Sequence, residues 1–271
     1  MAATMQTAPL QPAVSAAPSP TDAWYFPAAG HEEALARLLY LIEYERPGGV
    51  MTGPSGVGKT TLLRMAAEEA AGQRRTVAIL DLAGATASDV ATRMLAACGL
   101  VPSSVETACD RETRLRNYLG GSILSGQPVV LIVDHVDRAD ADAAAGLDRL
   151  LAGLDETGGG LTLILSAGET LASEFAAVAG RWCELRVDVP AIPQVEIAGY
   201  LGSSVEAAGC DVQFDDGATQ RLYAFAGGIP RLINRAVRLA CLSAAADGQR
   251  DVSAPNIEAV LGELPAVPNA A

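Results

Sequence analysis

Histidine, cysteine and aromatic residues are scarce in this chain. It has two histidines, His31 and His135, and five widely scattered cysteines with no CxxC pair. Metal-binding sites need such ligands at close spacing, so the sequence argues against a site of the zinc-finger kind. Only 4% of the residues are aromatic although 50% are hydrophobic. The core must therefore consist mainly of Ala, Leu and Val, which favours helices over a β-sandwich.

Basic residues and long apolar runs are also lacking. Lys and Arg number 19 against 32 Asp and Glu, which gives a net charge of −13. Binding to nucleic-acid phosphates depends on clustered basic residues, so this balance disfavours a nucleic-acid partner, although a local basic patch is not excluded. No run of roughly 18 apolar residues and no basic segment ahead of an apolar one is present, so we expect no direct membrane span and no export signal. Scattered, reduced thiols agree with a cytoplasmic protein.

The length of 271 residues allows one large α/β domain and a smaller second one. Residues 1–22 are rich in Ala, Pro, Ser and Thr without periodicity and predict a disordered tail, and 266–271 form a second tail. Trp24-Tyr25-Phe26-Pro27 then suggests an anchor for the start of the folded chain. Residues 23–191 are expected to form the α/β domain, and residues 192–265, with their helical pattern throughout, a small all-helical lid domain.

Short apolar runs alternate with helix-like segments in the first domain. The runs lie at 48–52, 76–82, 128–133, 161–165 and 183–189. Such an alternation predicts a parallel sheet covered by helices on both faces, in which ligands bind beyond the carboxyl ends of the strands.

The first of these runs leads into a segment that fits the phosphate-loop pattern GxxxxGK[ST] at every fixed position. The segment is Gly53, Pro54, Ser55, Gly56, Val57, Gly58, Lys59 and Thr60, followed by Thr61. Glycines allow successive backbone N–H groups to point at phosphate oxygens. Lys59 is expected to reach the β- and γ-phosphates, and Thr60 to offer its hydroxyl to Mg²⁺. The segment predicts ATP as the ligand and Mg²⁺ as the cofactor.

A second signal is the buried-strand pattern of residues 129–133, which ends at Asp134. A carboxylate at this place suits the coordination shell of a nucleotide-bound Mg²⁺. The alternative is an aspartate that merely caps the following helix.

The sequence resembles AAA+ ATPases of the ExeA/GspA type from general secretion, which are related to the TniB/TnsC ATPases of transposition. Four stretches carry the resemblance: HEEALARLLYLIE, GPSGVGKTTLLR, VVLIVDH and FAGGIPRLINRAVRLACLSA. They extend from about residue 24 to residue 265. The resemblance implies a P-loop NTPase of the AAA+ class with a helical lid, ATPase activity and assembly into a homo-oligomer.

Two arginines receive roles from this resemblance. Arg231, in Gly228-Ile229-Pro230-Arg231, matches the lid arginine that touches the γ-phosphate. Arg181 lies just ahead of the fifth strand, where the family carries an arginine that acts on the nucleotide of the neighbouring subunit. Arg186 is a rival for that role, and an ordinary surface ion pair is the alternative for Arg181.

Two positions depart from the family. Asp134 is followed by His135 instead of the glutamate that orients the attacking water. The imidazole of His135 could accept a proton from water. An equally good interpretation is that His135 is merely hydrogen-bonded at the end of the strand. Asp137 could act as the carboxylate, or could simply start a helix. Ser166 replaces the usual amide side chain of the first sensor. We therefore expect good Mg·ATP binding and slow hydrolysis.

Three hypotheses for the biological role follow. The first is an oligomeric ATP-dependent switch or assembly factor with a protein partner in a secretion or envelope machine. Secretion-type relatives usually continue into a membrane span that this sequence lacks, so a membrane role would require a partner. The second is a transposition-type ATPase that assembles on DNA and recruits a transposase. The third is an ATP-sensing adaptor without hydrolysis.

Overall fold

The computed structural model describes residues 24–155 and 159–264, and these form two compact units. We call residues 37–51, 63–155 and 159–187 the α/β unit, and residues 24–36, 52–62 and 188–264 the helical unit. The tails predicted at 1–22 and 266–271 lie outside the described residues. The division into domains at residue 191 stays a prediction, because the segment 52–62 groups with the helical unit.

The α/β unit is built around a sheet. Within the described residues the sheet has five strands in the order β2-β3-β4-β1-β5. The strands are β1 (Gly48–Thr52), β2 (Thr76–Asp81), β3 (Val129–Asp134), β4 (Leu161–Ser166) and β5 (Leu185–Asp188). The pairs β2–β3, β3–β4 and β1–β4 are parallel. The expected parallel sheet is confirmed, and each strand lies where an apolar run predicted it.

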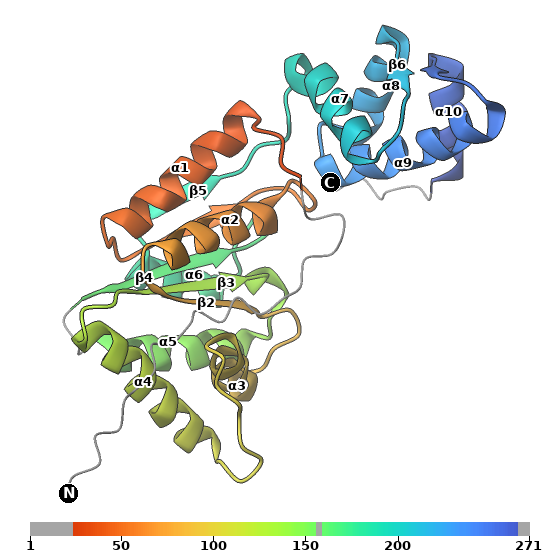
Figure 1. Cartoon of the computed structure of the whole chain (residues 1–271). Helices are drawn as coiled ribbons and strands as arrows, with labels where there is room; N and C mark the ends of the chain where they lie inside the picture. The colour runs from red at the N-terminus through yellow and green to blue at the C-terminus, as the bar shows by residue number, and fades with distance from the viewer. Residues whose placement is uncertain (1–23, 156–158, 265–271) are drawn as a thin grey trace, which may run out of the picture. The chain divides into compact units, whose positions relative to one another are not determined.

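Helices cover both faces of this sheet, as expected (Figure 1). The helices of the first part of the chain are α1 (Ala29–Glu43), α2 (Lys59–Gly72), α3 (Ala87–Ala97), α4 (Ala108–Leu124), α5 (Ala141–Asp155) and α6 (Ser173–Trp182). A short 3₁₀ turn, η1 (Val136–Arg138), follows β3. Helices α3 to α5 lie on one side of the sheet, and α2 lies on the other.

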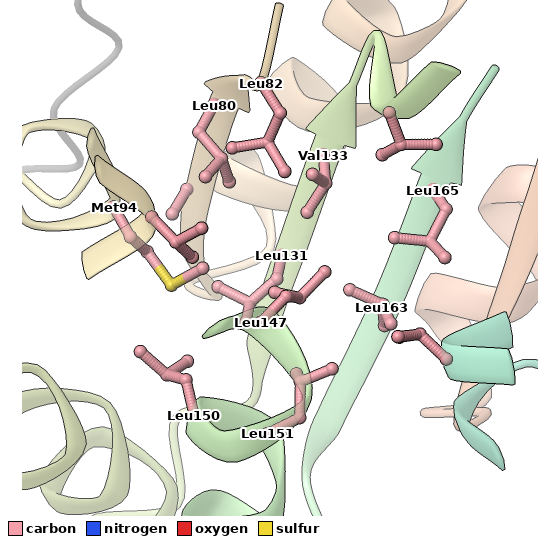
Figure 2. Packing of buried hydrophobic residues seen from close by; sticks show 14 of the residues in the cluster. Leu80, Leu82, Met94, Leu131, Val133, Leu147, Leu150, Leu151, Leu163 and Leu165 are labelled. Atoms are coloured by element: carbon pink, nitrogen blue, oxygen red, sulfur yellow. The ribbon is translucent and has the colours of Figure 1, made fainter. Parts of the chain in front are cut away.

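Strand β3 shows why a continuous apolar run forms here. All six of its residues are buried. Leu131 and Val133 point into the core on the side of α3 and α5 (Figure 2). Val130 and Ile132 alternate with them and are equally inaccessible to solvent. Because successive side chains of a strand point to opposite faces, a strand covered on both faces must be apolar at every position.

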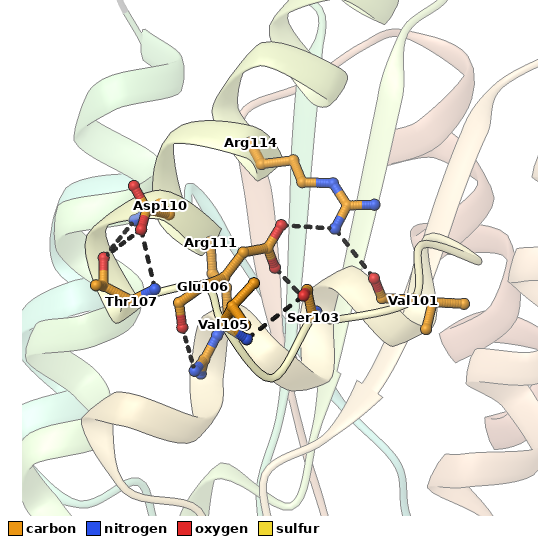
Figure 3. A network of polar contacts seen from close by, with 8 residues as sticks. All are labelled: Val101, Ser103, Val105, Glu106, Thr107, Asp110, Arg111 and Arg114. Atoms are coloured by element: carbon orange, nitrogen blue, oxygen red, sulfur yellow. Dashed lines mark hydrogen bonds and ion pairs between the residues drawn. The ribbon is translucent and has the colours of Figure 1, made fainter.

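The connection between α3 and α4 is held by a polar network (Figure 3). Arg114 donates hydrogen bonds to the carbonyl oxygen of Val101 and to the carboxylate of Glu106, both at 3.0 Å. Thr107 and Asp110 form a capping box that starts α4. This network explains why α4 begins at Ala108 and not earlier.

The helical unit contains most of the predicted lid. Its helices after residue 192 are the 3₁₀ turn η2 (Gln194–Glu196), α7 (Ile197–Ala207), α8 (Asp216–Ala226), α9 (Pro230–Asp247) and α10 (Ala254–Glu263). The expectation of an all-helical lid is wrong in one detail: β6 (Gln213–Phe214) pairs in parallel with β7 (Asp251–Val252). Each of these strands has only two residues, so neither produces an apolar run that a sequence pattern could indicate.

The predicted anchor joins this unit. The rings of Trp24 and Phe26 lie 5.2 Å and 5.4 Å from the ring of Tyr200, measured between centroids. Both side chains pack against the core formed by α7 to α10. Among the helices that the structure describes, none has the length and apolar character needed to cross a bilayer.

Candidate nucleotide site

The phosphate loop connects β1 to α2, as the pattern predicts, and belongs to the helical unit. Gly56 and Gly58 have φ angles of 85° and 113°. Side chains other than hydrogen rarely adopt these angles, which explains both glycines. Nζ of Lys59 donates hydrogen bonds to the carbonyl oxygens of Gly53 (2.6 Å) and Pro54 (3.0 Å). Lys59 is the only lysine of the chain, and its ammonium group lies at the loop.

A buried histidine supports the loop from α1. His31 is 5% exposed, and its Nε2 lies 2.8 Å from the carbonyl oxygen of Val57. A methyl group placed on Gly58 would lie 3.6 Å from the same ring nitrogen, so the ring packs directly beside the loop. Sequence reasoning missed this role. A signal existed, because His31 precedes the buried residues Ala34 and Leu38 by three and seven positions and so shares their face of the helix.

Arg231 lies at the start of α9 and contacts the phosphate loop. Its backbone N–H donates to the carbonyl oxygen of Gly56 at 3.2 Å, and its Nη1 donates to Oγ of Ser55 at 3.4 Å. Its exposed guanidinium group therefore lies beside the loop, and the loop carries a second positive charge next to that of Lys59. Two cations and a set of backbone N–H groups make a strong site for a polyphosphate.

A cavity of about 120 Å³ adjoins the loop within the same unit. On one side it is bordered by Val57, Gly58 and Thr61. Aromatic and lid residues complete its lining: Trp24, Tyr25, Phe26, His31, Leu62, Ile192, Tyr200, Pro230 and Asn234. A cavity with aromatic walls and several polar groups suits a planar ligand group with polar edges. The sequence indicated the three aromatic residues only as an anchor.

The carboxyl edge of the sheet in the α/β unit carries a second cluster. Asp134 at the end of β3 is 4% exposed, and its Oδ1 accepts a hydrogen bond from the backbone N–H of His135 at 2.9 Å. Asp81 ends β2 and is the register partner of Asp134. Sequence reasoning missed Asp81, although residues 76–81 repeat the pattern of an apolar strand that ends in a carboxylate.

His135 follows with left-handed backbone angles, φ 55° and ψ 40°. This conformation is rare for a residue with a side chain and is common at functional sites. Its Nδ1 is buried 3.2 Å from Oδ2 of Asp81 and 3.7 Å from Oδ2 of Asp134. Among the described residues this nitrogen forms no hydrogen bond with good angles, so both contacts are close approaches of Nδ1 to a carboxylate oxygen and are not hydrogen bonds.

The remaining polar candidates at this edge differ in burial. Ser166 at the end of β4 is fully buried, and within the described residues its Oγ has no hydrogen-bond partner. Asp137 lies in the 3₁₀ turn η1, is exposed and comes close to Gly168, which follows β4. Asp137 is thus at the carboxyl edge of the sheet but is not part of a buried site.

Arg181 contacts residues outside both clusters. Arg181 at the end of α6 is 58% exposed and donates to the carboxylate of Asp148 at 3.2 Å. Nε1 of Trp182 donates to the other oxygen of Asp148 at 2.8 Å, and the Arg181 guanidinium lies 5.1 Å from the Trp182 ring centre. Arg186 is an exposed residue of β5. The surface ion pair is therefore present, and action on a neighbouring subunit stays a prediction.

Residues 42–173 match a family model described as an AAA domain. The matched segment contains the phosphate loop and strands β1 to β4. The chain is also similar to General secretion pathway protein A of Aeromonas hydrophila, with 25% identity over 248 residues. That match covers 86% of this chain but 44% of the relative, so the chain spans less than half of the relative's length. The expected resemblance to ExeA/GspA-type AAA+ ATPases is confirmed, whereas the relation to the TniB/TnsC ATPases stays a prediction.

Two solved structures illustrate the shared fold. The ORC2 protein of Aeropyrum pernix, in ADPNP and ADP complexes, matches with a TM-score of 0.65 and 16% identity, covering 92% of this chain and 72% of that one. The RuvB Holliday junction branch migration motor of Thermotoga maritima matches with a TM-score of 0.58 and 15% identity, covering 86% and 68%. At these identities the likeness concerns the fold alone, and it confirms the P-loop NTPase architecture expected from the phosphate loop and strand pattern.

Proposed function

We propose that this protein binds Mg·ATP, hydrolyses it slowly and acts as an ATP-dependent switch. The observation that carries the proposal is the position of Arg231: a lid arginine contacts Ser55 and Gly56 of the phosphate loop, beside the ammonium group of Lys59. A triphosphate on the loop would meet both cations. Closure of the lid would thus depend on the γ-phosphate, which is what a nucleotide switch requires.

The adjoining cavity is the proposed site for the base of ATP. Because Gly58 and Thr61 border both the loop and the cavity, a ligand whose phosphates lie on the loop can place its base between the aromatic walls. His31 would hold the Val57 carbonyl away from the phosphates and keep the neighbouring N–H groups directed at them.

The oxygen donors proposed for Mg²⁺ have suitable chemistry. Thr60 in the first turn of α2 offers a hydroxyl, and Asp134 offers a buried carboxylate whose Oδ1 is oriented by the N–H of His135. Mg²⁺ prefers hard oxygen ligands and keeps several waters and phosphate oxygens, so few protein donors suffice. When bound, the ion neutralises charge on the transferred phosphoryl group.

Slow hydrolysis follows from the residue after Asp134. His135 carries no carboxylate with which to orient water, and its Nδ1 is directed at Asp81 and Asp134. Only Nε2 would be left to accept a proton from the attacking water. A histidine side chain is expected to activate the attacking water less well than a glutamate, because the histidine side chain reaches less far. Asp137 as a substitute carboxylate is less supported, since it is exposed in a turn.

The cellular role remains a separate proposal. Similarity to a protein of the general secretion pathway supports a role as an assembly factor with a protein partner in such a machine. An oligomeric state and a cytoplasmic location belong to the same proposal. Arg181 would leave Asp148 to act on a neighbouring subunit. The net charge of −13 argues against assembly on DNA. Salt-sensitive retention on DNA that requires ATP would favour the transposition-type alternative. Equal partner binding with and without hydrolysis would favour the adaptor.

The single lysine allows a direct test. An amine-specific acetylating reagent can modify only Lys59 and the chain's terminal amine, and mass spectrometry separates the two. We expect Mg·ATP to protect Lys59 and not the terminus. Lys59→Ala should weaken ATP binding by at least about 30-fold, because losing one partner of a charged, hydrogen-bonded pair costs about 2 kcal/mol or more. Arg64→Ala, a charge change farther along α2, is the matched control and should retain binding. Unchanged ATP affinity in Lys59→Ala would refute the proposal.

A further inference from the structure

Asn234 on α9 borders the aromatic cavity beside the phosphate loop and is held in one orientation by α7. Its Oδ1 accepts two hydrogen bonds, from the hydroxyl of Tyr200 and from the hydroxyl of Ser204, both at 2.9 Å. Tyr200 and Ser204 are each 4% exposed. Burial raises the pKa of Tyr200, so its hydroxyl keeps its proton and remains a donor.

These two bonds determine what the amide offers to the cavity. A primary amide has an acceptor end and a donor end. The acceptor end of Asn234 is occupied by two hydroxyl donors, whereas the reversed amide would require both hydroxyls to act as acceptors instead. Among the described residues, Nδ2 donates to no partner. The end of Asn234 that is left for a ligand is therefore a hydrogen-bond donor.

The surroundings specify the kind of ligand group. The rings of Trp24 and Phe26 both contact Tyr200, and all three line the cavity together with Asn234. The same cavity reaches Gly58 and Thr61 of the phosphate loop. A flat heteroaromatic base attached to phosphates on that loop would pack between the aromatic walls and offer a ring acceptor to the Asn234 amide, beside the hydroxyls of Tyr25 and Thr61 that also line the cavity.

We propose that Asn234 recognises the nucleotide base by donating a hydrogen bond from Nδ2 to a ring nitrogen of the purine. Tyr200 and Ser204 are positioning residues that select this orientation of the amide. The inference rests on the proposed binding of ATP and names the group that reads its base. An N–H donor selects for a ring acceptor and does not read the exocyclic amino group of adenine, which is itself a donor.

The test uses purine triphosphates in which one ring nitrogen is replaced by CH. The full chain is titrated with ATP and with its 1-deaza, 3-deaza and 7-deaza analogues in the presence of magnesium. We expect one analogue to bind about three- to tenfold more weakly than ATP, the size of one net hydrogen bond, and the other two to bind like ATP. Asn234→Asp keeps the shape and the acceptor oxygen but has no N–H at neutral pH, and it should bind ATP and that analogue equally.

Two controls separate the possible failures. Asn117→Asp on the exposed surface of α4 makes the same chemical change away from the cavity and should keep the preference for ATP. Asn234→Ala, which adds no charge near the triphosphate, should behave like Asn234→Asp. Equal binding of all four nucleotides by the wild type, or a preference that survives in Asn234→Ala, would overturn the inference while leaving ATP binding intact. Absence of binding by every nucleotide would instead refute the proposed function.

Discussion

Two buried hydroxyl groups on strand β4 provide a test with opposite expected signs. Thr162 is 2% exposed and donates a hydrogen bond to the carbonyl oxygen of Arg46 at 2.8 Å. Ser166, four residues along the same strand, is 0% exposed, and its Oγ lacks a partner in the described part of the chain. A buried polar group is costly only where its hydrogen bond is missing. The two buried hydroxyls therefore differ in whether a hydrogen-bond partner is present.

The expected free energies follow from that difference. Ser166→Ala removes a hydroxyl whose burial without a partner costs about 1–3 kcal/mol and opens only a small gap, so we expect the α/β unit to gain about 1 kcal/mol. Thr162→Val keeps the volume but leaves the Arg46 carbonyl without its donor, so we expect a loss of about 1–2 kcal/mol. In a unit of this size, 1 kcal/mol corresponds to about 2–4 °C in melting temperature.

The assay is urea unfolding followed by tryptophan fluorescence. Trp182 lies in the α/β unit and Trp24 in the helical unit, so a Trp24→Phe background reports on the α/β unit alone. If Ser166→Ala destabilised the unit by more than about 0.5 kcal/mol, the hydroxyl would have a native partner and the reasoning would fail. The same variant tests the first-sensor prediction, since a role for Ser166 in hydrolysis requires turnover to fall in a protein that has become more stable.

Three further predictions concern the proposed activity and the core. His135→Ala should reduce an already slow steady-state ATP turnover and leave ATP affinity nearly unchanged; rapid turnover that survives the change would contradict the role given to the imidazole. Asp148→Asn removes an exposed ion pair and should alter stability by less than about 1 kcal/mol, whereas Arg181→Ala should lower turnover only under conditions where light scattering detects oligomers with ATP. Burial raises the pKa of Cys98 from 9.0 to about 12. As the pH rises, the Cys98 thiol therefore ionises in the unfolded chain before it ionises in the folded protein. The stability that the buried thiol contributes is complete below pH 9 and is lost as the pH rises toward 12, at up to about 1.4 kcal/mol per pH unit. The urea midpoints of Cys98→Ala and of the wild type should converge over that range.

The strands and the phosphate loop could be predicted because their causes are local. A strand buried on both faces, such as residues 129–134, must be apolar at each position, and this requirement is visible in any window of the sequence. The loop needs glycine where φ is positive, at Gly56 and Gly58, and one ammonium group at Lys59. These constraints depend on neighbouring residues in the chain and therefore leave a readable pattern.

The partners of these groups could not be predicted, because they come from distant parts of the chain. Nothing in the spacing of residues joins His31 to Val57, or Asp81 to His135, and the paired strands β6 and β7 are too short to show a period. The orientation of Asn234 depends on two hydroxyl groups of another helix.

The sequence by itself thus determined the class of fold, the phosphate-binding segment and the candidate magnesium carboxylate, since each is a property of a short segment. The tertiary structure decided which groups face one another: the histidine under the loop, the arginine beside it and the amide end that borders the cavity. Hydrogen bonds and ion contacts act over about 3–4 Å, so they are specified only once folding has brought separate segments together.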